Sequence, residues 1–195
     1  LIDLLIKYLK IKVKKFKIIN KFKFSHNITV KKLYEKIKQI DEYRDNLFIP
    51  NLKNKFSKDI YSTYVSMLPK SKFVYNLKSN KDFRGDFIET LKTNYSGQIS
   101  ILIAKKNKVR GHHFHHSKVE KFFVIKGKAI FKMIHIIDRK EVKYELSDKK
   151  RIIVETIPGW QHYIKNTGST DLIVLLWSNE VFNVKKPDTF KIEIN

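Results

Sequence analysis

Two regions of the chain differ in the spacing of their apolar residues. In the first region, VKKLYEKIKQIDEY places apolar residues at helical spacing from Val30 to Ile40, which predicts an amphipathic helix that Thr29 can cap. A second stretch, KDIYSTYVSMLP, ends at Pro69. Together these stretches predict a small helical unit, which is too short to be expected as an independent domain.

From residue 72 the pattern changes to short apolar runs that are separated by turn residues. The runs are KFVYNL, QISILIA, EKFFVIKG, KAIFKMIHII, EVKYEL, RIIVETI, HYIKN and DLIVLLW. Eight runs of this kind, with Gly, Pro or Ser-Asp between them, are typical of a double-sheet or barrel architecture. We therefore predict a mainly β protein, in which a double sheet or barrel over residues 72–195 follows a small helical segment within residues 1–71.

The beginning of the chain has a third pattern. KIKVKKFKIINKFKF alternates Lys with apolar residues, which is the period-two character of strands, although no partner strands are evident. The first residue is Leu rather than Met, so we expect the chain to begin inside a longer polypeptide. No apolar run is long enough to cross a bilayer, and no signal cleavage site follows the first residues. We expect a cytoplasmic protein with no membrane partner.

The composition limits the kinds of site that the chain can build. With 42% hydrophobic and 13% aromatic residues, it has enough apolar surface to fold. It contains no cysteine, which excludes disulfides, thiolate metal sites and cysteine nucleophiles. Any metal site must therefore use imidazole and carboxylate ligands.

The net charge suggests a nucleic-acid-binding protein, but the kind of basic residue argues against one. The formal charge is +22, yet only five of the 41 basic residues are Arg, the residue that supplies bidentate contacts to bases and phosphates. The lysines are spread along the whole chain rather than gathered in a patch. We expect no nucleic-acid partner, and an electrostatic field that attracts an anionic substrate such as a nucleotide sugar.

Five of the seven histidines lie in two short segments, GHHFHH and GWQHY. On a strand, residues two apart face the same side, so His113 and His115 would project together. Glu120 follows at the start of the next predicted strand, and His162 lies at the start of a distant one. Such a set can converge inside a barrel, where it suits zinc, iron, manganese or nickel.

The same segments resemble the two half-motifs of the cupin superfamily. HFHHSKVEKFFVIKG matches H-x-H, four residues, E, six residues, G, and PGWQHYIKN matches P-G-x-x-H-x-x-x-N. The resemblance implies a jelly-roll-like cupin barrel that binds a divalent metal, with zinc as the first candidate, through His113, His115, Glu120 and His162. Asn107 stands where the general signature has Gly, a change we expect to be tolerated because Asn also accepts a left-handed turn.

Longer runs resemble one family within the cupins. DFRGDFIE, GQISILIAKKNKVRGHHFHHSKVEKFFVIKGKA, RIIVETIPGWQHYIKNTG, LLWSNEVF and KPDT are similar to the C-terminal cupin of bacterial bifunctional UDP-2-acetamido-2,6-dideoxy-hexulose epimerase/reductases, which serve capsule and O-antigen synthesis. Residues 27–80 look like the end of that family's short-chain dehydrogenase domain and its bridge to the cupin. We therefore expect a remnant of that domain over residues 1–71 and a cupin domain over residues 72–195.

This resemblance also implies a function. The family's cupin epimerises C3 of a UDP-4-keto-6-deoxy-N-acetylhexosamine, and its dehydrogenase domain then reduces C4. For this chain we expect the epimerisation, a UDP-sugar substrate and a homodimer. A Gly-rich dinucleotide loop and a Tyr-x-x-x-Lys pair are not found in a suitable context. NADPH is therefore expected as a cofactor only if the rest of the dehydrogenase domain is present.

A more distant resemblance, to metal-independent nucleotide-sugar epimerases, adds residues that contact substrate. The motifs D-x-R-G-x-F-x-E and R-G-x-H of those enzymes both occur here, which implies that Arg84, Glu89 and Arg110 bind the substrate. In those enzymes the His of R-G-x-H is the catalytic base, and it falls on His113. Because one side chain cannot readily be ligand and base together, we favour the ligand role.

Several alternatives remain open at this point. With His113 as a ligand, the catalytic base is open among His116, Tyr163 and Lys121, which lie near the motifs in sequence. The metal could have a purely structural role, because four protein ligands can close a zinc site. The chain could also bind sugar nucleotide or dimerise without catalysis, or it could be a cupin oxygenase or isomerase that uses another metal.

Overall fold

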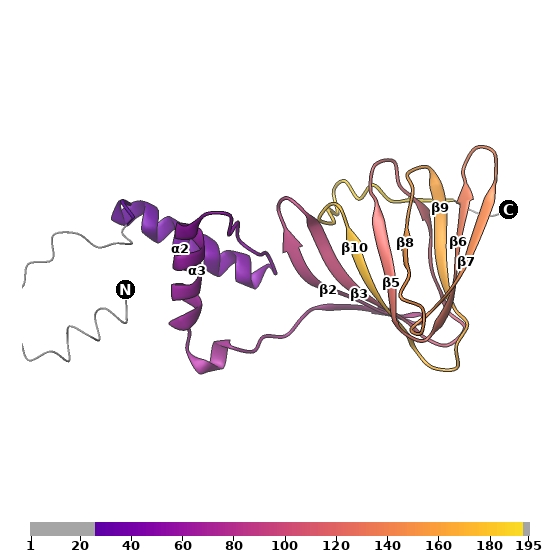
Figure 1. Cartoon of the computed structure of the whole chain (residues 1–195), viewed down its shortest axis with the longest axis horizontal. Coiled ribbons are helices and arrows are strands. Elements are labelled where there is room, and N and C mark those ends of the chain that lie inside the picture. The colour runs from indigo at the N-terminus through magenta and orange to yellow at the C-terminus, as the bar shows by residue number, and fades with distance from the viewer. Residues whose placement is uncertain (1–25, 193–195) are drawn as a thin grey trace, which may run out of the picture.

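The structure, a computed structural model, describes residues 26–192. Within this range, two α-helices lie at one end and a β-barrel at the other, joined by an extended segment (Figure 1). The fold is therefore mainly β with a small helical unit before the barrel, as the apolar pattern predicts. The strands predicted near the start of the chain lie outside the described residues, and the domain boundary between residues 71 and 72 stays a prediction.

The helices begin at side chains that cap them. Helix α2 spans Val30–Asp45, and the hydroxyl of Thr29 accepts a hydrogen bond from the Lys32 backbone N–H at 3.3 Å. Helix α3 spans Lys55–Ser66, where Asn54 caps the first turn and so starts the helix earlier than the sequence pattern indicates. Neither of these described helices is long and apolar enough to cross a membrane.

The barrel consists of two antiparallel sheets with crossed connections. Neighbouring strands in each sheet are mostly distant in sequence, so the two halves of the histidine pattern come together although about 45 residues separate them. The six-stranded sheet has the order β1 (Ser79–Asp82), β2 (Gly85–Thr93), β3 (Gly97–Ala104), β10 (Leu172–Ser178), β5 (Glu120–Lys126) and β8 (Ile153–Glu155). The five-stranded sheet has the order β11 (Phe190–Lys191), β4 (Val109–Phe114), β9 (Trp160–Asn166), β6 (Lys128–His135) and β7 (Glu141–Ser147).

One predicted strand does not form. The first residue of KFVYNL ends the short 3₁₀ turn η1 (Lys70–Lys72), and the rest of the run is irregular chain, with Phe73 60% and Val74 82% exposed. The hairpin of β1 and β2 supplies the strands in this part of the chain instead. The apolar pattern misses β1 because all four of its residues are exposed, and their strand conformation depends on backbone pairing with β2.

The core lies between the two sheets of the barrel. Phe131, Leu172 and Val174 have no exposed surface, and the alternation along β10 directs every second side chain inward. The buried Asn166 side chain donates a hydrogen bond to the Ala104 carbonyl oxygen at 2.8 Å. This bond joins the end of β9 to the end of β3, and so ties the two sheets together.

The position of Phe131 predicts a large effect on stability. Phe131→Ala should lower the free energy of unfolding by about 3–5 kcal/mol, because the barrel cannot close around the cavity left behind. Ile137→Ala is the control, since this side chain is 81% exposed in the turn after β6, and it should change stability by less than about 0.5 kcal/mol. Urea unfolding followed by circular dichroism measures both, and similar losses would contradict the core position of Phe131.

Candidate metal centre and substrate pocket

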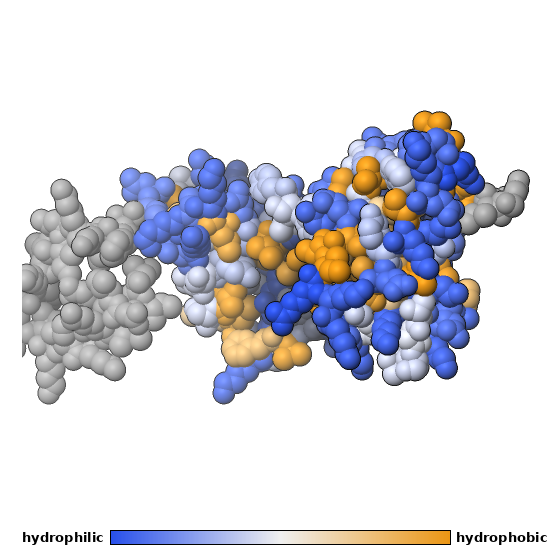
Figure 2. Space-filling view, turned by 45° about the vertical axis from the view of Figure 1, so that its right-hand side comes forward, coloured by the Kyte–Doolittle hydropathy of each residue, from blue (hydrophilic) through white to orange (hydrophobic). Residues whose placement is uncertain are grey.

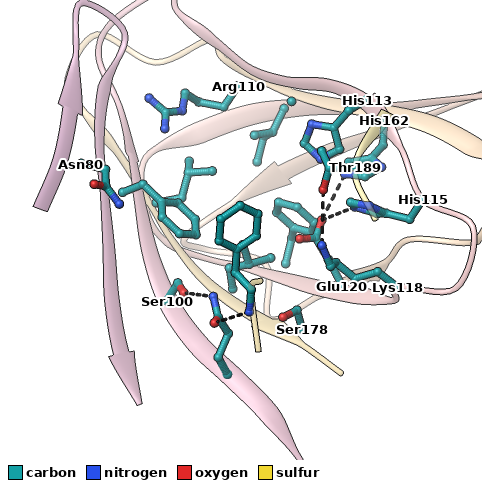
Figure 3. A pocket seen from close by; sticks show the side chains of 18 of the residues that line it. Asn80, Ser100, Arg110, His113, His115, Lys118, Glu120, His162, Ser178 and Thr189 are labelled. Carbon is teal, nitrogen blue, oxygen red and sulfur yellow. Dashed lines mark hydrogen bonds and ion pairs between the residues drawn. The ribbon is translucent and has the colours of Figure 1, made fainter. Parts of the chain in front are cut away.

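Four side chains from both sheets point to one place inside the barrel. His113 lies on β4, His115 just beyond the end of that strand, Glu120 at the start of β5 and His162 on β9. Their ligand atoms all lie within 4.8 Å of one another. Figure 3 shows the imidazoles of His115 and His162 directed at the Glu120 carboxylate, with His113 beside them. The structure therefore brings together the whole ligand set that the sequence suggests.

The backbone of β4 leaves regular strand geometry immediately before this group. The pairing of β4 with β9 shifts register between Gly111 and His113, and His112 has a φ of +63°. A Cβ atom on Gly111 would lie 2.7 Å from the His162 carbonyl oxygen. The absence of a side chain at Gly111 thus lets the two strands approach, and His113 comes to lie opposite His162.

The charges of this group are set by burial and by contacts among its members. Burial raises the pKa of Glu120, but contacts with the His115 and His162 imidazoles outweigh that effect and hold the pKa below its ordinary value. Burial and the neighbouring His162 lower the pKa of His113 to about 3. At neutral pH Glu120 is therefore an anion and His113 a neutral imidazole, which are the protonation states that metal ligands require.

The hydrogen bonds around His115 fit a cation in the middle of the group. Its Nδ1 atom lies 2.5 Å from the Asp188 carbonyl oxygen, which can only accept, so Nδ1 carries the proton. In a neutral imidazole the Nε2 atom then holds a lone pair that faces the Glu120 Oε2 atom 3.3 Å away, so the two atoms satisfy each other only through a positive charge between them, either a second proton on the imidazole or a metal ion. A divalent cation between the two atoms would satisfy both of them, so the donor set fits a metal.

The four candidate ligands line a cavity of about 490 Å³. This volume lies within the range of roughly 300–1,000 Å³ that is common for small-molecule sites. In Figure 3 Arg110 and Asn80 lie on one side of the cavity and the histidines on the other, with aromatic rings between them. Apolar side chains from both sheets and from the segment after β10 form the middle of the cavity, namely Phe87, Leu102, Phe122, Ile164, Leu176 and Phe182.

The predicted substrate residues Arg84, Glu89 and Arg110 also line this cavity. Both guanidinium groups bind the carboxylate of Asp82, with Arg84 Nη2 at 2.6 Å and Arg110 Nη1 at 3.1 Å. The hydrogen bond from Arg84 is the main reason that the pKa of Asp82 is lowered to about 2. Glu89 forms an ion pair with Lys92 at 2.6 Å. The structure thus places two guanidinium groups together at the same anion, an arrangement that also suits phosphate.

The three residues among which the catalytic base was left open do not line the cavity. His116 is exposed, and its ring packs on Phe190 at 4.5 Å. Tyr163 follows His162 on β9, so it faces the opposite side of the sheet and stacks on His112 at 4.5 Å.

Lys121 is also directed away from the cavity. Its Nζ atom pairs with Glu155 at 3.2 Å and lies over the Trp177 ring at 5.6 Å, on the outer face of the six-stranded sheet. Each of the three candidate bases directly follows a candidate ligand in the sequence. Nearness in sequence suggested these residues, but successive strand residues face opposite ways, so Lys121 and Tyr163 face away from the cavity. His116 lies beyond the end of β4 and is exposed.

The sequence did not single out several residues of the cavity wall. Lys118 lies between His115 and Glu120 in the sequence, and its buried side chain lines the cavity. The Gln98 side chain donates to Ser100 Oγ at 3.3 Å and accepts from the Phe182 backbone N–H at 3.0 Å. Asp188 does not line the cavity but contacts His115 from outside it, and it lies in the KPDT run, whose similarity to the family carried no role for it. These residues could be identified only from the structure, because they come from segments far apart in the chain.

Comparison with known proteins gives consistent matches. The family described as "Polysaccharide biosynthesis C-terminal domain" matches residues 80–190. UDP-2-acetamido-2,6-beta-L-arabino-hexul-4-ose reductase from Pseudomonas aeruginosa is 41% identical over 169 residues, which are 87% of this chain and 45% of that protein. This chain therefore spans about half the length of that curated relative.

Solved structures of one protein are similar over most of the described chain. The crystal structure of the capsular polysaccharide assembling protein CapF from Staphylococcus aureus has a TM-score of 0.82 at 38% identity, over 86% of this chain and 49% of that chain. A structure of CapF with the inhibitor 3-isopropenyl-tropolone has a TM-score of 0.81 at 38% identity, over 86% of this chain and 48% of that chain. The chain belongs to the polysaccharide biosynthesis C-terminal domain family, as the cupin domain of the capsule and O-antigen epimerase/reductases.

Proposed function

We propose that this cupin domain holds a divalent metal, with zinc as the first candidate, and epimerises C3 of a UDP-4-keto-6-deoxy-N-acetylhexosamine during synthesis of a capsule or O-antigen precursor. The observation that carries the proposal is that the candidate metal ligands and two adjacent arginines line one cavity. The relatives named above act on a UDP-hexulose or assemble capsular polysaccharide, which supports the choice of substrate.

The chemical problem is to remove a proton from the carbon beside a ketone. A divalent cation supplies a positive charge that polarises a ketone oxygen and stabilises the negative charge developing on it. The protein's part is to present the ligands in the correct protonation states and to hold the sugar ring against them. The pKa of about 3 makes His113 a poor proton acceptor at neutral pH, which favours its role as a ligand over its role as a base.

The other end of the cavity fits the diphosphate of a UDP-sugar. Arg84 and Arg110 present their guanidinium groups to one anion, Asp82, and a diphosphate offers several oxygens to the same donors. The aromatic and aliphatic side chains between the two ends offer apolar surface against which a sugar ring can pack. We propose that the diphosphate fixes the substrate so that the sugar reaches the four ligands.

The chemistry of an inhibitor of a relative suggests a probe for the proposed metal. CapF was crystallised with 3-isopropenyl-tropolone. A tropolone carries a carbonyl and a hydroxyl oxygen on adjacent carbons, a pair that chelates divalent cations. For this chain we propose that such a compound would bind in the cavity and compete with the keto sugar.

Reduction of C4 with NADPH is part of the proposal only for a polypeptide that contains the dehydrogenase domain of the longer relatives. We also propose a homodimer, which the family resemblance implies. The proposed place of action is the cytoplasm, where nucleotide-sugar precursors are made.

The metal proposal predicts a selective loss in a ligand variant. The wild-type chain should bind one Zn²⁺, and His162→Gln should weaken that binding by more than the roughly 10- to 100-fold typical of an outer-shell change, because it removes a direct ligand. His135→Gln is the matched control, since His135 pairs with Asp138 outside the cavity. Competition with a chromophoric chelator measures both. Equal affinity in wild type and His162→Gln would contradict the assignment.

The epimerase proposal predicts exchange of one proton. With full metal occupancy, the protein should replace the C3 proton of a UDP-4-keto-6-deoxy-N-acetylhexosamine by solvent deuterium, seen by NMR and as a mass increase. Metal removal should abolish the exchange. Substrate binding without exchange would instead support a non-catalytic sugar-nucleotide-binding domain, and oxygen uptake would support an oxygenase.

The phosphate contact predicts an effect on substrate without an effect on metal. Arg110→Ala should weaken UDP-sugar binding by roughly 10- to 100-fold, since a hydrogen bond to a charged group contributes about 1.5–3 kcal/mol. Arg151→Ala removes the same charge from an exposed position outside the cavity and should have little effect. Isothermal titration calorimetry measures UDP-sugar and Zn²⁺ binding in turn. Unaltered UDP-sugar binding in Arg110→Ala would count against the contact.

A further inference from the structure

One residue after β10, Asp188, contacts both a candidate metal ligand and the loop that carries it. Its carboxylate accepts hydrogen bonds from three successive backbone N–H groups, those of His116 at 2.9 Å, Ser117 at 2.9 Å and Lys118 at 2.8 Å, and from the Ser117 hydroxyl at 2.9 Å. These bonds account for a pKa of Asp188 that lies below its ordinary value although burial opposes this. The loop between β4 and β5 is thus fastened to a segment about 70 residues away.

The backbone of the same residue binds the ligand. The Asp188 carbonyl oxygen accepts a hydrogen bond from Nδ1 of His115 at 2.5 Å. This bond fixes the tautomer in which Nε2 has a free lone pair, and it fixes the plane of the ring. With both contacts in place, the position of the His115 ring relative to its own loop is determined by Asp188.

The conformation of Asp188 shows that these contacts hold it firmly. Its φ is +38°, a left-handed value that non-Gly residues adopt only when the surrounding structure compensates. Four hydrogen bonds to the carboxylate provide such compensation. The residue is therefore held by its side chain in a backbone conformation that directs its carbonyl group at His115.

A second contact joins the same two segments but does not reach a ligand. The buried Lys118 ammonium donates to the Pro187 carbonyl oxygen at 2.6 Å and to Thr189 Oγ1 at 3.3 Å, and it pairs with Glu180 at 3.4 Å. Its three protons thus have three acceptors among the described residues. Lys118 holds the segment in place, whereas Asp188 both holds the segment and contacts His115.

We propose that Asp188 is a positioning residue of the metal centre: its carboxylate fastens the 116–118 loop, and its carbonyl group sets the tautomer and orientation of His115. This inference rests on the proposed metal-binding function. It extends that function to a residue outside the candidate ligand group and outside the cavity lining, and its consequence is a preorganised ligand in the metal-free protein.

The test uses the full chain with Zn²⁺ as the probe. Asp188→Asn keeps one oxygen acceptor and tolerates the positive φ, and Asp188→Gly keeps the backbone freedom but loses the carboxylate. Asp148→Asn is the matched control, because Asp148 accepts a backbone hydrogen bond from Gly127 at 3.0 Å in a turn outside the cavity. Affinity for Zn²⁺ is measured by chelator competition, and the His115 tautomer by ¹⁵N NMR of imidazole nitrogens in the metal-free protein.

We expect Asp188→Gly to bind Zn²⁺ about 10- to 100-fold more weakly than wild type, as outer-shell changes do, and to lose the single Nδ1–H tautomer of His115. The Zn²⁺ affinity of Asp188→Asn should fall between those of Asp188→Gly and wild type, and the affinity of Asp148→Asn should match that of wild type. Wild-type affinity and tautomer in both Asp188 variants would overturn the positioning role while leaving the metal site intact. Failure of the wild-type protein to bind Zn²⁺ would overturn the metal-binding function and this role with it.

Discussion

A buried carboxylate constrains the whole barrel. An isolated anion inside an apolar core costs more than the folding free energy of a domain, so Glu120 must have partners. His115 and His162 supply them from a loop and from the opposite sheet. Their positions follow from the crossed strand order, which sets β4 beside β9 and β5 beside β10. The packing of the two sheets is therefore coupled to the charge balance of one side chain, and the same crossing opens the cavity that reaches the arginines.

The fold could be predicted wherever the local pattern and the tertiary environment agree. Thr29 caps α2 as its side chain indicates, and Asn107 adopts the left-handed conformation that the Gly of the cupin signature would take, with a φ of +62°. KFVYNL has a strand-like composition but no partner strand, so it remains irregular. The reverse holds for β1, whose polar residues become a strand because β2 pairs with them. Pairing partners are a property of the topology, which a single-sequence pattern does not contain.

The candidate site shows the same division. His113, His115, Glu120 and His162 could be recognised because strand periodicity and motif spacing place them on common faces, although the bulge at Gly111 was not foreseen. Residues chosen for nearness in sequence face away from the cavity, since each directly follows a candidate ligand. Residues that hold the candidate ligands in place could not be predicted from the sequence either. Asp188 is close to His115 only in space, and no local spacing relates the KPDT run to the histidine segment.

The two arginines at the far end of the cavity already share an anion of their own. Asp82 is joined to Arg84 through a single turn and is therefore always present at a high effective concentration. Any incoming anion must displace this internal competitor. A single negative charge, such as chloride or a lone carboxylate, gains little by the exchange, whereas a diphosphate offers more charge and more oxygens than Asp82 does. The β1–β2 hairpin keeps the guanidinium groups ordered without a ligand, and for the UDP-sugar that we propose as substrate it would act as an affinity threshold that favours a diphosphate over small anions.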